Sequence, residues 1–374
     1  MKWSFKIGSA FGIELRMHIT FFLIVLFAAY IWGVLFERGY QGAVYGAALI
    51  SVLFACVVIH ELAHSLMAIH YGGQVSSITL LPIGGVSLLK NMPEDPMKEL
   101  VVSVVGPMTN VVIGFLLIPL LYLIPDPVGG PWGAYADVDL FTGISVQAFI
   151  SYLLFINFVL AFFNMVPAFP LDGGRVLRSI LALKMSYVKA TRAAVTIGQI
   201  FAFILGITGL LLGAWLWIII AVFIYLGASQ EGAGTEMKSI LARLKVGQAM
   251  AGDVRVLSPE DRLSDVVGVA LRTYQEDFPV VSDGRIEGML TRSGLIKGLH
   301  DVGPEASVSE VMTREFPVVR ADAPFSEVYV RMNEFGIKAV PVVEDGRLLG
   351  MVTMEHLSEV FMLLSATDQP VIPE

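Results

Sequence analysis

Residues 60–64 of the chain read His60-Glu61-Leu62-Ala63-His64, and they end an apolar run from Ser51 to Ile59 that is typical of a membrane-spanning helix. Residues four positions apart share one face of a helix, so the two imidazoles can bind one zinc ion. The Glu61 carboxylate beside them can accept a proton from a zinc-bound water. Ionisable groups are costly within hydrocarbon and are rare there without a function. The stretch therefore favours a membrane helix that carries a metalloprotease site.

The same five-residue pattern also occurs by chance on surface helices that bind no metal. Here the residues on both sides are apolar and leave no polar face for water, which favours a zinc site over stray polar residues packed between helices. His70 would complete a three-histidine zinc site, but such a site needs a glycine where this chain has Met67. We therefore expect the helix to continue and His70 to lie at its interfacial end.

The composition predicts a polytopic membrane protein with a soluble C-terminal part. Hydrophobic residues make up 55% of the 374 residues and charged residues 16%, and the mean hydropathy is +0.72. Most of the net charge of −8 belongs to the region after Tyr225. No basic stripe or aromatic-rich patch indicates a nucleic-acid partner. The single cysteine, Cys56, excludes an intrachain disulfide and is expected to be a buried apolar residue.

Apolar runs predict six membrane crossings. The expected spans are 17–36, 43–69, 100–124, 146–166, 193–212 and 214–226, with a tight turn near Gly213 between the last two. The first run is interpreted as an anchor and not as a cleavable signal peptide. Lysine and arginine gather in the N-terminal segment and in the second and fourth loops. By the positive-inside rule both termini of this multi-pass cell-membrane protein are then cytoplasmic.

The segment 74–90, between the second and third spans, does not have a helical pattern. Its two strand-like runs, 76–81 and 86–89, are separated by Pro82 and by Gly84-Gly85, which predicts a β-hairpin. An open sheet cannot expose unpaired backbone groups to lipid. The hairpin must therefore be covered by protein or offer its edge to an incoming strand.

A catalytic zinc generally has three protein ligands and one position open to water. The strongest candidate for the third ligand is Asp172, in Asn164-Met165-Val166-Pro167-Ala168-Phe169-Pro170-Leu171-Asp172-Gly173-Gly174-Arg175. The two prolines prevent a regular helix, and the glycine pair lets the backbone approach a metal closely. A plain turn would explain the prolines and glycines equally well. It would not explain Asn164, an amide at membrane depth.

These two segments, together with Gly106-Pro107-Met108-Thr109-Asn110, resemble the site-2 protease family of intramembrane zinc metalloproteases over about residues 10–230. The resemblance implies one zinc ion per chain. It also implies a role for five residues: zinc binding by His60, His64 and Asp172, general base and acid catalysis by Glu61, and support of the substrate or the oxyanion by Asn164.

The resemblance further implies a membrane-protein substrate that is cut within its transmembrane segment, as in regulated intramembrane proteolysis. A carbonyl within a helix is already hydrogen bonded, so this segment has to unwind before it is cleaved. The resemblance gives residues 74–90 the role of binding the unwound segment by β-addition.

The C-terminal tail contains an internal repeat. Residues 278–291 align with residues 340–353 at an offset of 62 positions, and each copy reads as strand, Asp-Gly turn, strand and helix. The tail resembles a tandem CBS-domain pair. We therefore expect a transmembrane core at 1–230, a linker at 231–245, and repeats at 246–303 and 304–366. The fold class is then a polytopic α-helical membrane protein with a short β-hairpin and a C-terminal α/β CBS pair.

CBS pairs commonly bind adenine nucleotides, with a Ser or Thr followed three residues later by an Asp on the ribose. Thr291 and Thr353 match the first position, whereas Gly294 and His356 stand where the Asp is expected. The resemblance therefore leaves two roles open. The pair either binds an adenine nucleotide and modulates the membrane core, or it serves as a module for homodimerisation or substrate docking.

Two other classes of protein compete with the protease. A CBS-gated transport protein would need an ion pathway and repeat symmetry in the membrane region, and the sequence indicates neither. A catalytically inactive membrane scaffold would not need every expected catalytic residue, yet all of them are present. The intramembrane zinc protease is therefore the preferred interpretation.

Overall fold

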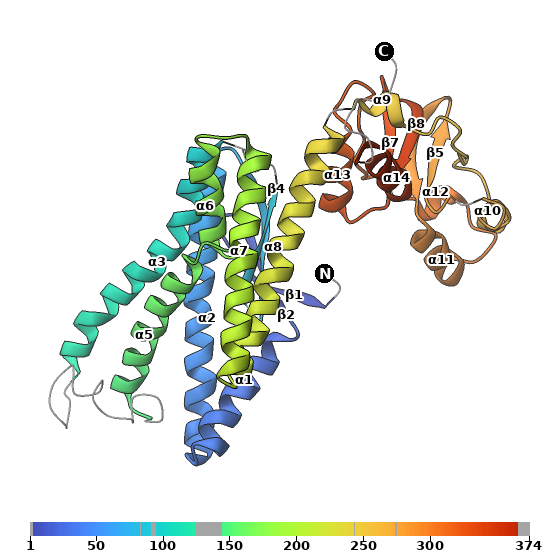
Figure 1. Ribbon diagram of the computed structural model, residues 1–374. Helices are drawn as coiled ribbons and strands as arrows, with labels where there is room; N and C mark the ends of the chain where they lie inside the picture. The colour runs from blue at the N-terminus through green and yellow to red at the C-terminus, as the bar shows by residue number, and fades with distance from the viewer. Residues whose placement is uncertain are drawn as a thin grey trace. The chain divides into compact units, whose positions relative to one another are not determined.

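The computed structural model describes residues 3–82, 84–90, 95–124, 144–242, 244–273 and 275–365. The chain forms two compact units, Met1–Gly232 and Ala233–Glu374 (Figure 1). The first unit contains most of the apolar helices, and the second contains the repeated part of the sequence.

Five helices in the described part of the chain are long and apolar enough to span a membrane. They are α2 (Gly39–His70), α3 (Pro96–Leu123), α5 (Val146–Asn164), α7 (Tyr187–Leu211) and α8 (Trp215–Leu241). The expected first span, 17–36, is instead a shorter apolar segment made of α1 (Phe21–Tyr30) and the π-helix η1 (Ile31–Leu35), because residues 17 and 18 belong to a strand.

The last two spans meet at Gly213, whose positive φ of 66° allows the tight turn between α7 and α8. Helix α8 extends well beyond the span expected at 214–226. It continues to Leu241, into the stretch 231–245 that we expected to be a linker. The sequence after Leu226 is more polar, but nothing in it prevents the backbone from remaining helical.

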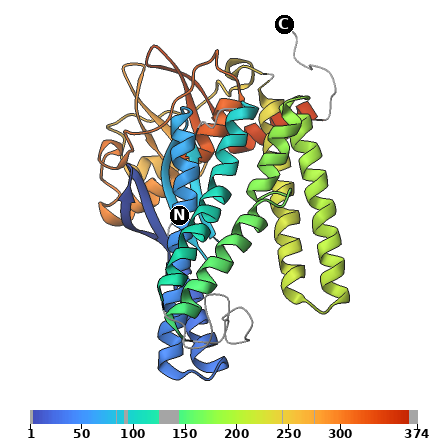
Figure 2. The ribbon, with the colours of Figure 1, turned by 90° about the vertical axis from the view of Figure 1, so that its left-hand side faces the viewer.

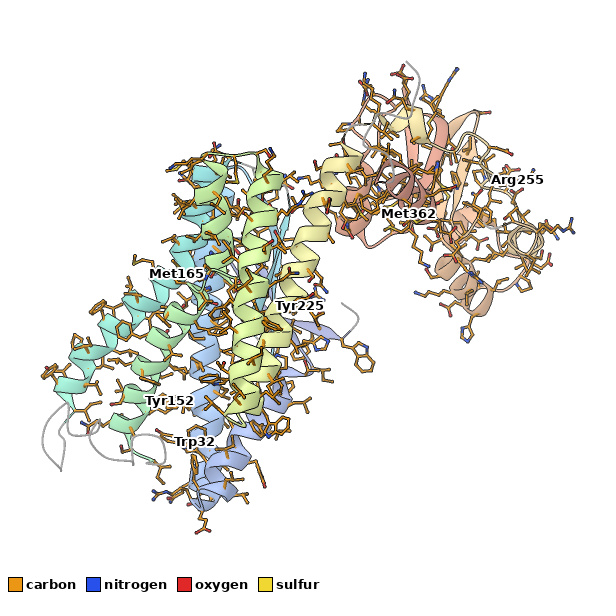
Figure 3. The ribbon with its side chains drawn as sticks, viewed as in Figure 1. Trp32, Tyr152, Met165, Tyr225, Arg255 and Met362 are labelled. Carbon is orange, nitrogen blue, oxygen red and sulfur yellow. The ribbon has the colours of Figure 1, made fainter. Side chains whose placement is uncertain are left out.

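The helices of the first unit pack against one another in a row of neighbouring pairs. Helix α2 contacts α1 and α3, while α3 also contacts α5 and α6 (Asp172–Ala182), and α6 contacts α7 (Figure 2). Trp32, Leu49 and Leu153 form one of the buried clusters between these helices. The ring of Trp32 meets that of Tyr152 edge to face, with 5.8 Å between centroids (Figure 3). Aromatic and aliphatic packing therefore holds this end of the bundle together.

A four-stranded sheet accompanies the helices, in the order β1 (Ser4–Ala10), β2 (Ile13–His18), β3 (Gln74–Leu81) and β4 (Gly84–Lys90). The hairpin expected at 74–90 is found as the antiparallel pair β3–β4, and β2 pairs with β3 in parallel. The N-terminal hairpin β1–β2 is not expected from the sequence, because its short alternation of apolar and charged residues was interpreted only as basic charge. Strand β4 lies at one edge of the sheet.

The second unit contains the two expected repeats. Its sheet has the order β5 (Phe278–Ser282), β6 (Arg285–Leu290), β8 (Arg347–Thr353) and β7 (Ala339–Glu344). Its helices are α9 (Val246–Ala249), α10 (Leu263–Ala270), α11 (Arg292–Asp301), α12 (Val308–Val311), α13 (Ser326–Phe335) and α14 (Met354–Ser365). Both Asp-Gly turns have positive φ at both residues, as a two-residue type I′ hairpin requires.

The two repeats exchange their opening segments. Val246 is buried in a cluster with Val340 of the second repeat, whereas Val308 is buried in a cluster with Phe278 of the first. The isolated β-bridges also repeat: shifting each residue of one bridge by 62 positions, up or down the chain, gives an equivalent bridge. The three equivalent pairs of bridges are Ala251↔Met351 with Met289↔Thr313, Leu257↔Val280 with Val319↔Val342, and Lys245↔Pro324 with Arg262↔Ser307. Each hydrophobic core therefore takes residues from both repeats.

Candidate metal centre

Helix α2 presents His60 and His64 on one face, and both side chains are buried. Their Nε2 atoms are 3.0 Å apart. Asp172, at the start of α6, places its Oδ2 atom 3.1 Å from Nε2 of His64 and 3.3 Å from Nε2 of His60. The structure thus brings together three side chains that the sequence predicts as metal ligands, although 108 residues separate His64 from Asp172.

The ring of His64 is oriented by helix α3. Its Nδ1 atom is 2.6 Å from the carbonyl oxygen of Val102, which can only accept a hydrogen bond, so Nδ1 carries the hydrogen. Gly106, one turn further along α3, lies against the other side of this ring. A Cβ atom at Gly106 would be 2.1 Å from Nε2 of His64, so only glycine leaves room for the imidazole.

The ring of His60 is oriented by a chain of buried amides. Its Nδ1 atom is 2.5 Å from Oδ1 of Asn110, whose Nδ2 donates to Oδ1 of Asn157 at 2.8 Å. Asn157 in turn donates from Nδ2 to the carbonyl oxygen of Leu153 at 2.8 Å. Because the chain ends at a carbonyl oxygen, each amide is assigned one orientation, and Nδ1 of His60 is the donor at the other end.

This orientation decides the chemistry of the site. With both Nδ1 atoms acting as donors, the two Nε2 atoms of the neutral rings face each other as acceptors, and a carboxylate oxygen faces both of them. Three mutually repelling acceptors are stable only when a cation or protons lie among them. Two imidazole nitrogens and one carboxylate oxygen are a donor set found at catalytic zinc sites, so the residues fit that metal.

Glu61 follows the first histidine directly and lies close to strand β4. A Cβ atom at Gly85 would be only 2.5 Å from Cγ of Glu61, so the backbone of β4 passes over the carboxylate side chain. A residue larger than glycine would displace Glu61 or the strand. The edge strand and the expected proton acceptor are therefore neighbours.

The segment before α6 is folded tightly enough to present Asp172 at a helix start. A Cβ atom at Gly173 would be 2.2 Å from the carbonyl oxygen of Val166, and one at Gly174 would be 2.5 Å from the backbone nitrogen of Phe169. Both glycines are thus required by close backbone contacts. Phe169, within this segment, is buried.

Asn164 ends helix α5, is half-buried, and its side chain forms no hydrogen bond within the described part of the chain. The structure does not connect it to His60 or His64. The amides that do so are Asn110 and Asn157. Asn110 belongs to the quoted segment 106–110 but was given no role, and Asn157 was missed. The signal that could have found both is an amide in the middle of an apolar helix.

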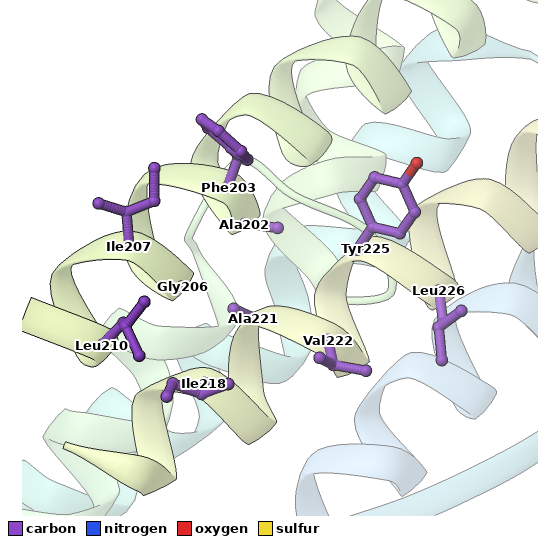
Figure 4. A pocket seen from close by; sticks show the side chains of 10 residues that line it. All are labelled: Ala202, Phe203, Gly206, Ile207, Leu210, Ile218, Ala221, Val222, Tyr225 and Leu226. Carbon is purple, nitrogen blue, oxygen red and sulfur yellow. The ribbon is translucent and has the colours of Figure 1, made fainter. Parts of the chain in front are cut away.

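An apolar groove of about 370 Å³ lies between α7 and α8 (Figure 4), and none of the residues that line it is charged. It offers no group for hydrolysis. A second cleft of about 510 Å³ lies in the C-terminal unit between α10 and α11, with Glu276, Arg292 and Glu355 among its lining residues.

The two threonines of the CBS-like repeats both cap helices. Thr291 accepts a hydrogen bond from the Gly294 N–H at 3.0 Å, and Thr353 accepts one from the His356 N–H at 3.2 Å. Among the described residues, Nδ1 of His356 is buried without a hydrogen-bond partner. The two repeats therefore differ at the position where a ribose carboxylate is expected.

Comparison with known proteins yields matches to both parts of the chain. The model of peptidase family M50 matches residues 48–205, and that of the CBS domain matches residues 246–301 and 308–363. Zinc metalloprotease MJ0392 of Methanocaldococcus jannaschii is 29% identical over 373 residues, which cover 99% of each chain. Putative zinc metalloprotease Rip3 of Mycobacterium tuberculosis is 27% identical, over 84% of this chain and 81% of the relative.

A solved structure is also similar. The site-2 protease from Methanocaldococcus jannaschii is 32% identical, with a match that covers 62% of this chain and 95% of the solved chain at a TM-score of 0.44.

Proposed function

We propose a mechanism and a set of active residues from one premise: the chain belongs to peptidase family M50, the site-2 proteases, and is a zinc-dependent intramembrane metalloprotease with a C-terminal CBS-domain pair. It acts on membrane proteins. A transport protein and an inactive scaffold are not favoured, because named relatives over most of the chain are zinc metalloproteases.

His60, His64 and Asp172 are the proposed zinc ligands. The observation that carries this assignment is that two Nε2 atoms and one Oδ2 atom lie within 3.3 Å of one another. All three are hydrogen-bond acceptors, and none of them carries a hydrogen. Asn110 and the Val102 carbonyl support the ligands, because they hold the Nδ1 hydrogens and so direct Nε2 toward the metal. Three protein ligands leave a fourth position for water.

Zinc held by these residues would supply Lewis acidity, which would lower the pKa of a bound water toward neutrality and polarise the substrate carbonyl. Glu61 is the proposed general base: it takes the proton of the attacking water and delivers it to the nitrogen of the leaving amine. The peptide bond between the carbonyl carbon and that nitrogen then breaks, and the water oxygen stays on the new carboxyl group. Asn164 is the proposed support of the substrate or the oxyanion.

The edge of β4 is the proposed substrate-binding strand. Its support is the position of β4 at the end of the sheet order, combined with the close approach of Gly85 to Glu61. An unwound substrate segment could add to this edge through backbone hydrogen bonds, which would bring one of its carbonyls beside the carboxylate.

The decisive experiment compares Glu61→Gln with His60→Ala in the purified full-length protein. The first variant keeps all three ligands, so we expect it to retain zinc and to lose about 10² to 10⁴ of the cleavage rate. The second removes a ligand and should lose both zinc and cleavage. Zinc lost from Glu61→Gln, or cleavage at the parent rate, would contradict the assignment.

Both termini are proposed to be cytoplasmic, with the metal site nearer that side. The support is the basic residues of the N-terminal segment and those between Arg175 and Arg192, in α6, in the turn after it and in the first turns of α7. A reporter fused to the C-terminus, active only in the cytoplasm, tests this orientation. A signal from an extracytoplasmic reporter at the same point would overturn it.

A second candidate function belongs to the CBS pair, which we propose binds an adenine nucleotide. Thr291 and Thr353 stand where ribose contacts are expected, and Nδ1 of His356, which is buried without a hydrogen-bond partner among the described residues, could bond a ligand. Because Gly294 and His356 replace the ribose carboxylate, the affinity should be modest. Calorimetry of the full-length protein with ATP, ADP and AMP tests this. No heat from any of the three would leave homodimerisation or substrate docking as the role of the pair.

A further inference from the structure

A buried ion cluster lies beside the segment that carries Asp172. Arg178, in the same helix α6, is only 4% exposed. Its Nε donates to Oε1 of Glu99 in α3 at 3.1 Å, and its Nη1 donates to Oε1 of Glu231 in α8 at 2.5 Å. Burying these charges is costly, and breaking one pair leaves a charge uncompensated. The cluster therefore joins α3, α6 and α8 through bonds that are costly to lose.

The guanidinium of Arg178 also stacks between two aromatic rings. Its Cζ atom is 4.9 Å from the ring centroid of Phe169 and 4.8 Å from that of Tyr187. Phe169 is 1% exposed and lies three residues before Asp172. Cation–π contacts fix the guanidinium relative to both rings. Arg178 lies in the helix that begins at Asp172, and it also contacts Phe169 in the segment just before Asp172.

Three residues on one face of helix α8 contact either the same segment or Arg178. A Cβ atom at Gly227 would be 2.5 Å from Cδ of Pro170, and Ala228 is fully buried in a cluster with Phe169. Glu231, one turn further on, bonds Arg178. Residues at these spacings lie together on a helix surface. One face of α8 therefore contacts the Phe169-Pro170 segment and Arg178 at once.

We propose that Arg178 and Glu231 are positioning residues that hold Asp172 at the metal site. The inference rests on the proposed function, because it takes Asp172 as the third zinc ligand. Without Glu231, Arg178 loses one of its two carboxylate partners, and α8 loses its polar contact with α6. The Phe169-Pro170 segment is then less constrained, and the Asp172 carboxylate meets the two histidines less often in binding geometry.

The test uses Glu231→Ala and Glu231→Gln in the full-length protein, with Ser229→Ala as the matched control. Ser229 lies on the same helix and accepts a hydrogen bond from Nε2 of Gln199 at 3.1 Å, so its loss removes an α7–α8 contact that does not involve Arg178. Zinc affinity is measured by chelator competition, and ligand geometry by the visible absorption of the cobalt-substituted protein. Values of kcat and KM are determined separately.

We expect Glu231→Ala to weaken zinc binding by about 10- to 100-fold, as loss of a residue that orients a ligand does. The cobalt spectrum and kcat should change with it. Glu231→Gln keeps a hydrogen-bond acceptor for Arg178 and should be intermediate, while Ser229→Ala should match the parent in zinc affinity and spectrum.

Gly227→Ala tests the contact between α8 and the Phe169-Pro170 segment by crowding it, because its new methyl group pushes against Pro170. It should alter the cobalt spectrum in the way Glu231→Ala does. Parent zinc affinity and an unchanged spectrum in both Glu231→Ala and Gly227→Ala would overturn the proposal. Failure of the proposed function is distinct: there, Asp172→Ala would bind zinc as tightly as the parent.

Discussion

At the scale of single residues, the two histidines differ in how their rings are held. The ring of His64 donates a hydrogen bond to a backbone carbonyl of α3. The ring of His60 donates one to the side chain of Asn110, which in turn donates one to the side chain of Asn157. Burying an amide in an apolar helix costs free energy unless all its groups are bonded. Asn110 and Asn157 satisfy that condition only together. Each is therefore placed to serve the metal centre and not the packing of the bundle.

Asn157→Leu tests this interpretation. The change removes the acceptor of Asn110 and lets that amide rotate away from His60, so zinc affinity should fall by about 10- to 100-fold in a chelator titration. Asn164→Leu is the comparison at the end of the same helix. It should retain parent zinc affinity and lower the cleavage rate, because its proposed partner is the substrate. Equal zinc affinity in both variants would contradict a role for Asn157.

At the scale of elements, the hairpin β3–β4 packs directly against the part of helix α2 that carries Glu61. The strand passes over Glu61 at Gly85, where no side chain fits. Because the sheet order ends at β4, this strand has an outer edge as well as a close contact with Glu61, the proposed proton acceptor. We therefore propose that β4 both binds the substrate and places the Glu61 carboxylate.

Gly85→Ala should separate substrate binding and the placement of Glu61 from metal binding. The added methyl group would displace Glu61 or the strand but touches none of the three ligands, so zinc should remain while cleavage falls by about 10² or more. Gly8→Ala, in the same sheet with open space around it, is the control. Cleavage by Gly85→Ala at the rate of Gly8→Ala would show that the close contact is unimportant.

Hydropathy located the spans but not the ends of the helices. Helix α8 continues beyond the expected residue 226 to Leu241. The first span is shortened because Met17 and His18 belong to β2 and pair with β1. Hydropathy reports which residues can face lipid, whereas backbone hydrogen bonds decide where a helix ends. The two criteria disagree wherever a helix leaves the apolar region without breaking.

At the scale of the whole molecule, the repeats of the second unit have diverged where they meet. Glu276 and Lys338 occupy equivalent positions 62 residues apart, and they bond each other at 3.0 Å. Identical residues there would place like charges together. The salt bridge with Lys338, reinforced by Arg292, lowers the pKa of Glu276 below its usual range.

Lys338→Glu should therefore lower the melting temperature of the second unit at neutral pH. Because the folded-state pKa of Glu276 is depressed, its stabilisation is present above the unfolded pKa and is lost as pH falls through the folded one. The difference between variant and parent should shrink as the solution is made acidic. Lys297→Glu makes the same charge change elsewhere in the unit and controls for net charge. A difference that grows with acid would contradict the argument.

A chain that ends at Gly234 tests what the second unit contributes. It lacks both CBS repeats but keeps Glu231, so its zinc affinity should equal that of the full-length protein. If the pair modulates the core without taking part in the chemistry, as we propose, the rate of substrate cleavage by this shorter chain should change. Unchanged cleavage in a side-by-side assay of the two chains would remove the regulatory role.

By itself the sequence determined the features that follow from short spacings. The helical repeat of His60 and His64, the hairpin at 74–90 and the repeat offset of the tail follow from the order of neighbouring residues and were predicted from it. The same holds for the choice of Asp172 as a third ligand, which came from its unusual local sequence and from family resemblance.

Only the tertiary structure decided which distant groups surround those residues. The pairing of His60 with Asn110, the passage of Gly85 over Glu61, the support of Asp172 by Arg178 and α8, and the exchange of segments between the repeats all join positions far apart in the chain. Local periodicity specifies a helix and its apolar face, but several partners can cover that face equally well. Close packing and complete hydrogen bonding of buried groups select among them, and both depend on the whole fold.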